Sequence, residues 1–274
     1  MNLLKRCISG AIMIVLAGGA LWLGGWFLAA VAGVVSVLMM LDVSSALRAG
    51  GYPVSRPVLI SAAALLFPAI WFFDLPGYLL VTGLALLAIT LLTVLKKEPD
   101  FKGVLGGFFA LIYPLFYAFM VLSLALADCK NGTVLGKEII LETVAIACVA
   151  DAFAYLGGSL LGKRKFCPAI SPKKTVAGFL AALIGGGVAG VLLSFWNFGA
   201  LPHDMLLWAP VGVLCGAVGQ LGDLLASMLK RHCGIKDYGQ YIPGHGGMMD
   251  RMDSIGACLI VVVLCMHRFV QRVL

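Results

Sequence analysis

Ser227 to Asp253 reads SMLKRHCGIKDYGQYIPGHGGMMDRMD, a polar stretch between two long apolar runs. It contains four Lys or Arg, three Asp, two His and five Gly. The apolar runs on either side decide the fold, because each approaches the length that crosses a lipid bilayer. Charge of this density beside such runs predicts a functional loop at a membrane surface.

The composition of the whole chain agrees with membrane-spanning runs. Of its 274 residues, 61% are hydrophobic and 12% are charged, and the mean hydropathy is +1.03. The net charge of +7 arises from short loops and not from a separate polar domain, so it indicates topology and anion sites and not nucleic-acid binding. The eight cysteines lack CxxC or zinc-type spacing, so neither a disulfide framework nor a structural metal is indicated.

Nine segments approach the roughly 20 mostly apolar residues that a spanning helix needs. We therefore predict an all-α, polytopic integral membrane protein with about nine transmembrane helices and short loops. Residues 1–130 would hold about five helices, and residues 131–274 would form a catalytic half with polar loops at 163–174 and 227–253. The segments are 7–24, 26–42, 57–73, 75–95, 103–126, 139–162, 175–198, 205–226 and 254–270.

Glycine and proline set two of these boundaries. The first two segments form one run that is too long for a single span, and we divide it at Gly24-Gly25. Pro76 predicts a break at Asp74-Leu75-Pro76. The basic N-terminus leaves a cleaved signal peptide as the alternative to a retained first helix.

The basic residues are distributed unevenly between the two sides of this topology. With a cytoplasmic N-terminus, 16 of the 20 Lys and Arg lie on the cytoplasmic side, and Lys130, Lys137, Arg268 and Arg272 lie on the other. An excess of Lys and Arg marks cytoplasmic loops. Both polar loops are therefore predicted to face the cytoplasm, and we expect the compact chain to lie in a bacterial inner membrane.

Two predicted helices carry polar stripes. Asp151, Tyr155 and Ser159 recur at helical spacing in one, and Gln220, Asp223 and Ser227 in the other. An ionisable group at membrane depth needs a partner, water or an ion. The stripes can line a substrate site, line a transport path, or hold helices together. Glycines at helical spacing nearby allow close helix packing and leave a homodimer open.

The loops supply cations and backbone amides beside these stripes. SPKKT, residues 171–175, places Ser171, Lys173 and Lys174 just before a predicted helix, whose N-terminus favours an anion. Such lysines also occur as topology markers or lipid head-group contacts. In the second loop, PGHGG brings Gly246 and Gly247, whose amides can approach phosphate oxygens closely.

The carboxylates predict magnesium. Mg²⁺ is commonly held by one or two carboxylates together with substrate phosphates and water. Asp223 and Asp250 are the first candidates, with Asp253 and Asp151 second, and the nearby cations would hold a polyphosphate. We therefore expect a metal–nucleotide site and not a calcium cage.

On these residues the chain resembles the phosphatidate cytidylyltransferase (CDP-diacylglycerol synthase) family, whose signature is a spaced series of polar and glycine positions. The stretches beginning at Asp151 and at Ser171 also look like family elements, so the resemblance covers roughly residues 145–265. The first half of the chain matches in hydropathy only. The signature positions present here are Ser227, Leu229, Lys230, Arg231, Lys236, Asp237, Gly239, Ile242, Pro243, His245, Gly246, Gly247, Met248, Asp250, Arg251, Met252 and Asp253.

The resemblance implies transfer of a cytidylyl group from CTP to phosphatidate, giving CDP-diacylglycerol and pyrophosphate. The site would combine catalytic residues, substrate-binding residues and metal ligands. His245 would orient phosphate and not transfer a proton, and Asp237 could instead anchor a neighbouring cation. The catalytic residues would be Asp223, Asp250, Lys230, Arg231, Lys236, His245 and Arg251; the substrate-binding residues Lys173, Lys174, Ser171, Ser227, Gly246, Gly247 and Tyr155; the magnesium ligands Asp223, Asp250, Asp253 and Asp151.

The chain departs from the family pattern at three positions. Ala177 and Ala226 stand where Glu is common, which removes two carboxylates near the implied metal site, and Tyr238 stands where Ser is usual. Three alternatives remain: a polytopic transporter, a cytidylyltransferase acting on another lipid phosphate, and a CDP-alcohol phosphatidyltransferase. The last is disfavoured because its DG-x2-AR run is missing from the sequence.

Overall fold

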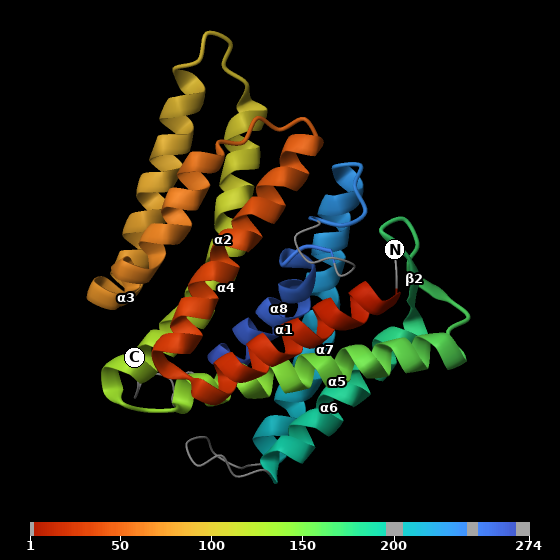
Figure 1. Cartoon of the computed structure of the whole chain (residues 1–274). Helices are drawn as coiled ribbons and strands as arrows, with labels where there is room; N and C mark the ends of the chain where they lie inside the picture. Colours follow the sequence, from red (N-terminus) through yellow and green to blue (C-terminus); the bar gives the residue numbers. More distant parts are fainter. Residues whose placement is uncertain (1–2, 196–204, 240–245, 267–274) are drawn as a thin grey trace. The chain divides into compact units, whose positions relative to one another are not determined.

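The structure, a computed structural model, describes residues 3–195, 205–239 and 246–266 (Figure 1). It is 83% helical, which confirms the all-α class. Eight helices and two short strands make up the described residues: α1 Leu3–Leu23, α2 Gly25–Ala49, α3 Arg56–Val94, α4 Phe101–Asn131, α5 Leu135–Leu161, β1 Lys165–Cys167, β2 Ser171–Thr175, α6 Val176–Ser194, α7 Met205–His232 and α8 Met249–Cys265.

Six helices in the described part of the chain, α2 to α7, are long and apolar enough to cross a membrane. The chain is therefore a multi-pass membrane protein. This number does not confirm the predicted count of about nine. Two predicted segments fall within the single 39-residue α3, and α8 has only 17 residues.

The chain divides into two compact units. The first contains Met1–Leu126 and Leu229–Asp250. In this unit α2 packs on α3, where the Trp26 and Trp71 rings lie 4.7 Å apart, and Tyr78 of α3 stacks on Phe119 of α4 at 4.4 Å. A segment from the C-terminal half of the chain, Leu229–Asp250, thus joins the N-terminal helices in this unit.

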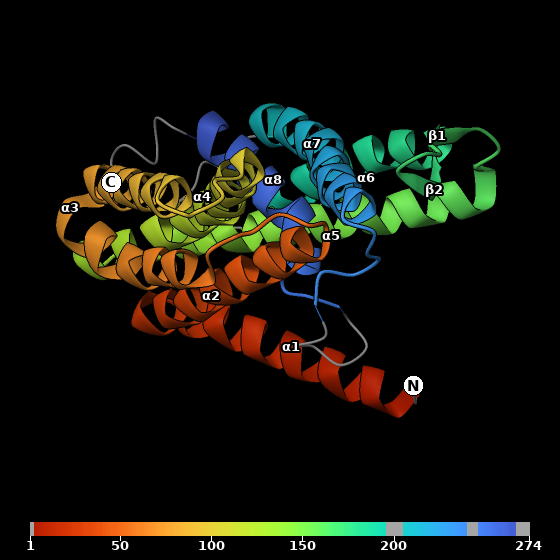
Figure 2. The same ribbon diagram turned by 90° about the horizontal axis from the view of Figure 1, so that it is seen from above.

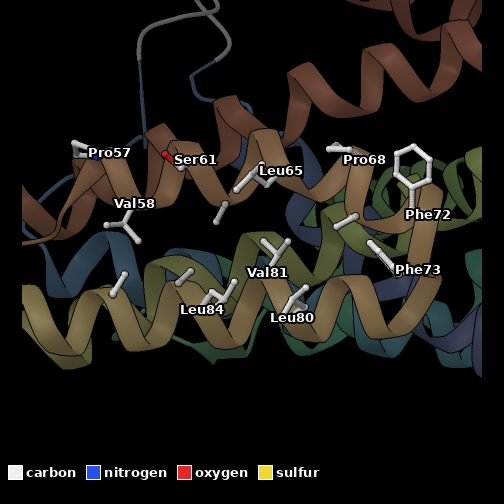
Figure 3. A pocket seen from close by; sticks show the side chains of 14 residues that line it. Pro57, Val58, Ser61, Leu65, Pro68, Phe72, Phe73, Leu80, Val81 and Leu84 are labelled. Carbon is white, nitrogen blue, oxygen red and sulfur yellow. The ribbon is translucent and has the colours of Figure 1, made fainter.

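The long helix α3 is a hairpin of two arms. Asp74 leaves the helical conformation with φ 49° and ψ −128°, two residues before Pro76, so the predicted break is confirmed. Figure 3 shows the arms side by side, with Leu65 on one and Leu84 on the other among the side chains between them. They line a groove of about 540 Å³ in which Ser61 is the one hydroxyl. Such a groove suits hydrocarbon and not a polyphosphate.

The second unit contains Ala127–Met228 and Arg251–Leu274. Its largest contact is between α5 and α6, which lie side by side in Figures 1 and 2. Small residues permit this approach, since a Cβ at Gly157 would overlap that of Ala181 and one at Gly185 would overlap Phe153. Glycine also packs α6 on α7: a Cβ at Gly186 would overlap the carbonyl of Gly212. These glycine-lined faces are thus used within the chain.

The predicted loop 163–174 contains an antiparallel β-ribbon. β1 pairs with β2 in the register Lys165 with Thr175 and Cys167 with Ser171, next to α6 (Figure 2). Thr175 then caps α6, because its Oγ1 accepts the N–H of Gly178 at 3.1 Å. The ribbon escaped hydropathy analysis because it lacks an apolar run.

The predicted loop 227–253 is wrong at both ends. α7 continues to His232 and α8 begins at Met249, so Lys230, Arg231 and Asp250 are helical. Hydropathy marks only the apolar part of a helix, whereas the backbone hydrogen bonds continue into the charged turns beyond it. Between these two helices the structure describes residues 233–239 and 246–248.

Candidate functional site

The first unit holds a cluster around Asp250, formed with Lys230, Tyr238 and Gly247. Lys230 Nζ lies 2.5 Å from Asp250 Oδ1, and each side chain is only 10% exposed. Asp250 Oδ2 accepts the backbone N–H of Tyr238 at 3.1 Å and that of Gly247 at 3.0 Å. One carboxylate thus fixes the end of α7, the loop and the start of α8.

The ammonium group of Lys230 is also held by an aromatic ring. It lies 5.3 Å from the centroid of the buried Tyr238 ring, close enough for a cation–π interaction. Gly246 has φ +79°, and a Cβ there would come within 2.8 Å of Asp250 Oδ2. Glycine at position 246 is therefore required both by backbone conformation and by the carboxylate beside it.

Two cations of the signature lie at the surface of the first unit. Arg231 and Lys236 are exposed, and Arg231 Nη1 donates to the carbonyl of Ile235 at 3.3 Å. Next to them, His232 Nε2 and Tyr52 Oη lie 2.8 Å apart. These cations are available to solvent-borne anions. The predicted His245 lies outside the described residues.

The second unit holds a cluster around Asp151, which contains Lys174, Gln220, Asp223 and Ser254. Asp151 accepts from Gln220 Nε2 at 2.9 Å and from Ser254 Oγ at 3.2 Å. Lys174 Nζ lies 2.8 Å from Asp223 Oδ2 and donates to the carbonyl of Gln220 at 3.1 Å. Asp151 also interacts electrostatically with both Asp223 and Lys174.

Four elements build the Asp151 cluster. α5 carries Asp151, β2 carries Lys174, α7 carries Gln220 and Asp223, and α8 carries Ser254. Close packing of α7 on α8 depends on Gly222, where a Cβ would overlap the carbonyl of Asp253. The ribbon and its Thr175 cap thus direct Lys174 toward α7.

The structure brings some of the predicted site residues of the second unit together and leaves others apart. Asp151, Lys174 and Asp223 come together, and Ser227 Oγ donates to Asp223 Oδ1 at 3.3 Å. The buried Asp253 accepts the N–H of Ser254 at 2.7 Å. Of the other predicted residues in the second unit, Tyr155, Lys173 and Arg251 are exposed, and Ser171 is half-buried. Among the described residues no hydrogen bond joins Tyr155 to the cluster.

Two polar residues in contact with predicted site residues were missed from the sequence. Ser254 was overlooked because it follows Asp253 directly. Asp42 belongs to an N-terminal run assigned on hydropathy alone, yet its Oδ2 accepts the N–H of Met249 at 3.0 Å. The sequence did contain a signal for Asp42: a carboxylate inside an apolar helix needs a partner, which marks it as a candidate for a specific contact.

The donor chemistry fits magnesium better in the second unit than in the first. Asp223 is 37% exposed and lies near Asp151, which gives two carboxylates with an accessible oxygen. Asp250 already accepts three donors. Across the described residues no group of three His, Cys, Asp or Glu side chains is placed to hold an ion. Mg²⁺ does not need three, since phosphates and water complete its shell.

Comparison with known proteins gives a consistent result. The cytidylyltransferase family matches residues 4–269 of this chain. A phosphatidate cytidylyltransferase from Synechocystis sp. is 33% identical over 275 aligned residues, covering 91% of this chain and 92% of the relative. Enzymes of the same name from Staphylococcus haemolyticus and Staphylococcus aureus are 39% and 40% identical over 121 residues, 43% of this chain and 45% of each relative.

Proposed function

We infer that this chain, which belongs to the cytidylyltransferase family, is a membrane enzyme that transfers a cytidylyl group from CTP to phosphatidate. The products are CDP-diacylglycerol and pyrophosphate. The observation that carries this function is the match to a phosphatidate cytidylyltransferase along nearly the whole chain. The sequence similarity that supports these substrates thus extends beyond the signature stretch and includes the N-terminal helices.

The reaction needs no general base. A phosphate monoester has a second pKa near about 6, so phosphatidate is largely dianionic at neutral pH and its oxygen can attack the α-phosphorus of CTP directly. The bond from the α-phosphorus to the bridging oxygen breaks, and pyrophosphate leaves with that electron pair. The main obstacle is repulsion between two anionic substrates, so the protein must supply positive charge.

We assign this charge to two kinds of cation. Lys174 and Lys230 are fixed by carboxylates, Asp223 and Asp250, and so keep their positions before substrate arrives. Arg231, Lys236 and Lys173 are exposed and would bind phosphate as it approaches. Fixed cations contribute most to catalysis, because they need no reorganisation during the reaction.

For magnesium we propose Asp223 and Asp151 as the best-supported ligands, with Asp250 and Asp253 retained as predicted ligands. Bound Mg²⁺ would offset negative charge on the phosphate oxygens. The protein's own contribution is to hold the carboxylates. Gln220 and Ser254 each donate to Asp151, and Lys174 stays beside Asp223.

We propose nine membrane passes in an inner membrane, with the loops at 163–174 and 233–248 facing the cytoplasm. The two arms of α3 count separately, since a 39-residue helix is about twice the length that a bilayer requires. α1 and α8 supply the remaining two passes. The uneven distribution of Lys and Arg supports this orientation. A homodimer remains a prediction.

Pyrophosphate release by the purified protein in detergent separates the enzyme from a transporter. We expect release to require CTP, magnesium and phosphatidate together, and to stop when any one is omitted. An isoprenoid phosphate in place of phosphatidate tests the alternative acceptor. Absence of release with all three components, together with solute uptake in vesicles, would support transport instead.

Native Cys167 reports the orientation of the β-ribbon. A membrane-impermeant maleimide should label it in inside-out vesicles and not in right-side-out vesicles, as read by peptide mass spectrometry. Cys233 is an internal control. Burial raises the pKa of the Cys233 thiol, so it should react slowly from either side. Labelling of Cys167 in right-side-out vesicles would reverse the topology.

A further inference from the structure

Asp42 is an acidic residue in the C-terminal half of the apolar helix α2. Its side chain is fully buried, with 0% of the residue exposed. A carboxylate inside an apolar helix is costly unless it is paired, so Asp42 needs a specific interaction. Its carboxylate accepts a hydrogen bond from Met249, which lies 207 residues away in the sequence.

That contact is at the start of α8. Met249 is the first residue of this helix, and its N–H has no carbonyl partner within the helix. Asp42 Oδ2 accepts this N–H at 3.0 Å, and the negative charge also suits the positive end of the helix dipole. Asp42 therefore caps α8 from a distant helix of the same unit.

Gly247 allows this carboxylate to approach the backbone. A Cβ at position 247 would lie 2.7 Å from Cγ and 2.9 Å from Oδ1 of Asp42. The Asp42 carboxylate thus occupies the space of the missing side chain. The same Gly247 donates its N–H to Asp250 Oδ2 at 3.0 Å.

Two carboxylates therefore hold one short segment. Asp250 binds the N–H of Gly247, Asp42 binds the N–H of Met249, and Asp250 follows Met249 directly. We propose that Asp42 is a positioning residue, which fixes residues 247–249 and so keeps Asp250 in its pair with Lys230. The expected effect of Asp42 on the reaction rate rests on the proposed function. Its expected effect on the structure of residues 247–249 rests on the hydrogen bonds alone.

The variants that test the role of Asp42 are chosen from the environment of its two carboxylate oxygens. Oδ1 is buried and has no hydrogen-bond partner among the described residues. In Asp42→Asn the amide oxygen can still accept the Met249 N–H, and the NH₂ group replaces the unpartnered oxygen. Asp42→Ala removes the acceptor altogether. Ser36→Ala is the matched control, because Ser36 is also buried in α2 but its Oγ donates within that helix, to the carbonyl of Ala32.

The kinetic test compares these three variants with the wild type in CDP-diacylglycerol formation. Asp42→Ala should lower kcat at least tenfold and change the KM for CTP less than threefold, because Lys230 and Asp250 remain but are no longer held. Asp42→Asn should restore kcat to within threefold of the wild type, and Ser36→Ala should match it. A kcat for Asp42→Ala within twofold of the wild type would overturn the proposal.

Hydrogen–deuterium exchange supplies the readout that is independent of activity. The amides of residues 247–249 should exchange at least tenfold faster in Asp42→Ala and at the wild-type rate in Ser36→Ala. Unchanged exchange in Asp42→Ala would refute the positioning role even if kcat falls. A wild type that forms no product while the exchange result holds would refute the proposed function and leave the contact itself established.

Discussion

Asp250→Asn is expected to lower kcat/KM for CTP at least a hundredfold. The Asp250 carboxylate accepts from Lys230, Tyr238 and Gly247, using both oxygens. A carboxamide has one oxygen, so either orientation points its NH₂ group at a donor. Removing one partner from a buried ion pair costs about 3–5 kcal/mol, and this loss would fall on Lys230, the cation that we propose for substrate phosphate.

Steady-state kinetics and thermal unfolding of the same preparations check this prediction. Asp100→Asn is the matched control, because Asp100 is an exposed aspartate in the connection between α3 and α4 whose side chain accepts the N–H of Lys102, a bond that an Asn oxygen can also accept. It should retain wild-type kinetics. If Asp250→Asn keeps kcat/KM within fivefold of the wild type, the Asp250 cluster has no catalytic role.

Asp223→Asn should lower turnover at least tenfold, about 1.4 kcal/mol, and raise the magnesium concentration needed for half-maximal rate. The Asp223 side chain is 37% exposed, and its charge both fixes Lys174 and is available to a cation. Asn keeps the size and one acceptor oxygen but loses the charge, so metal affinity should fall more than folding stability.

Magnesium titration of the rate distinguishes this role from a structural one. Excess magnesium should recover part of the lost turnover in Asp223→Asn, whereas Asp100→Asn should show the wild-type magnesium dependence. Turnover within tenfold of the wild type, with an unchanged magnesium requirement, would remove Asp223 from the metal site and leave it as the ion-pair partner of Lys174.

The helices were largely predictable because hydropathy reports burial in lipid directly. The break at Asp74 followed from Pro76, and the start of α6 at Val176 lay one residue from the expected boundary. The end of α7 and the start of α8 were harder to predict from the sequence. Lys230 and Asp250 are helical, yet their charge marked them as loop residues.

The carboxylates of the Asp151 cluster were also predictable from hydropathy. Asp151 and Asp223 were detected as carboxylates in apolar helices, and the structure places both with Lys174. Asp42 has the same signal but no recognisable motif around it, and its contact at Met249 is set by tertiary packing. Local sequence carries no information on such a distant pair. The β-ribbon was missed because its five-residue strand SPKKT has no alternation of apolar residues.

The fate of the CTP phosphorus atoms tests the central claim most directly. With CTP labelled in the α-phosphate, purified protein, magnesium and phosphatidate should yield label in the chloroform-soluble lipid, recovered as CDP-diacylglycerol. With CTP labelled in the γ-phosphate, all released label should appear as pyrophosphate. Label from the γ-phosphate in the lipid, or α-label that stays in the aqueous phase, would contradict cytidylyl transfer.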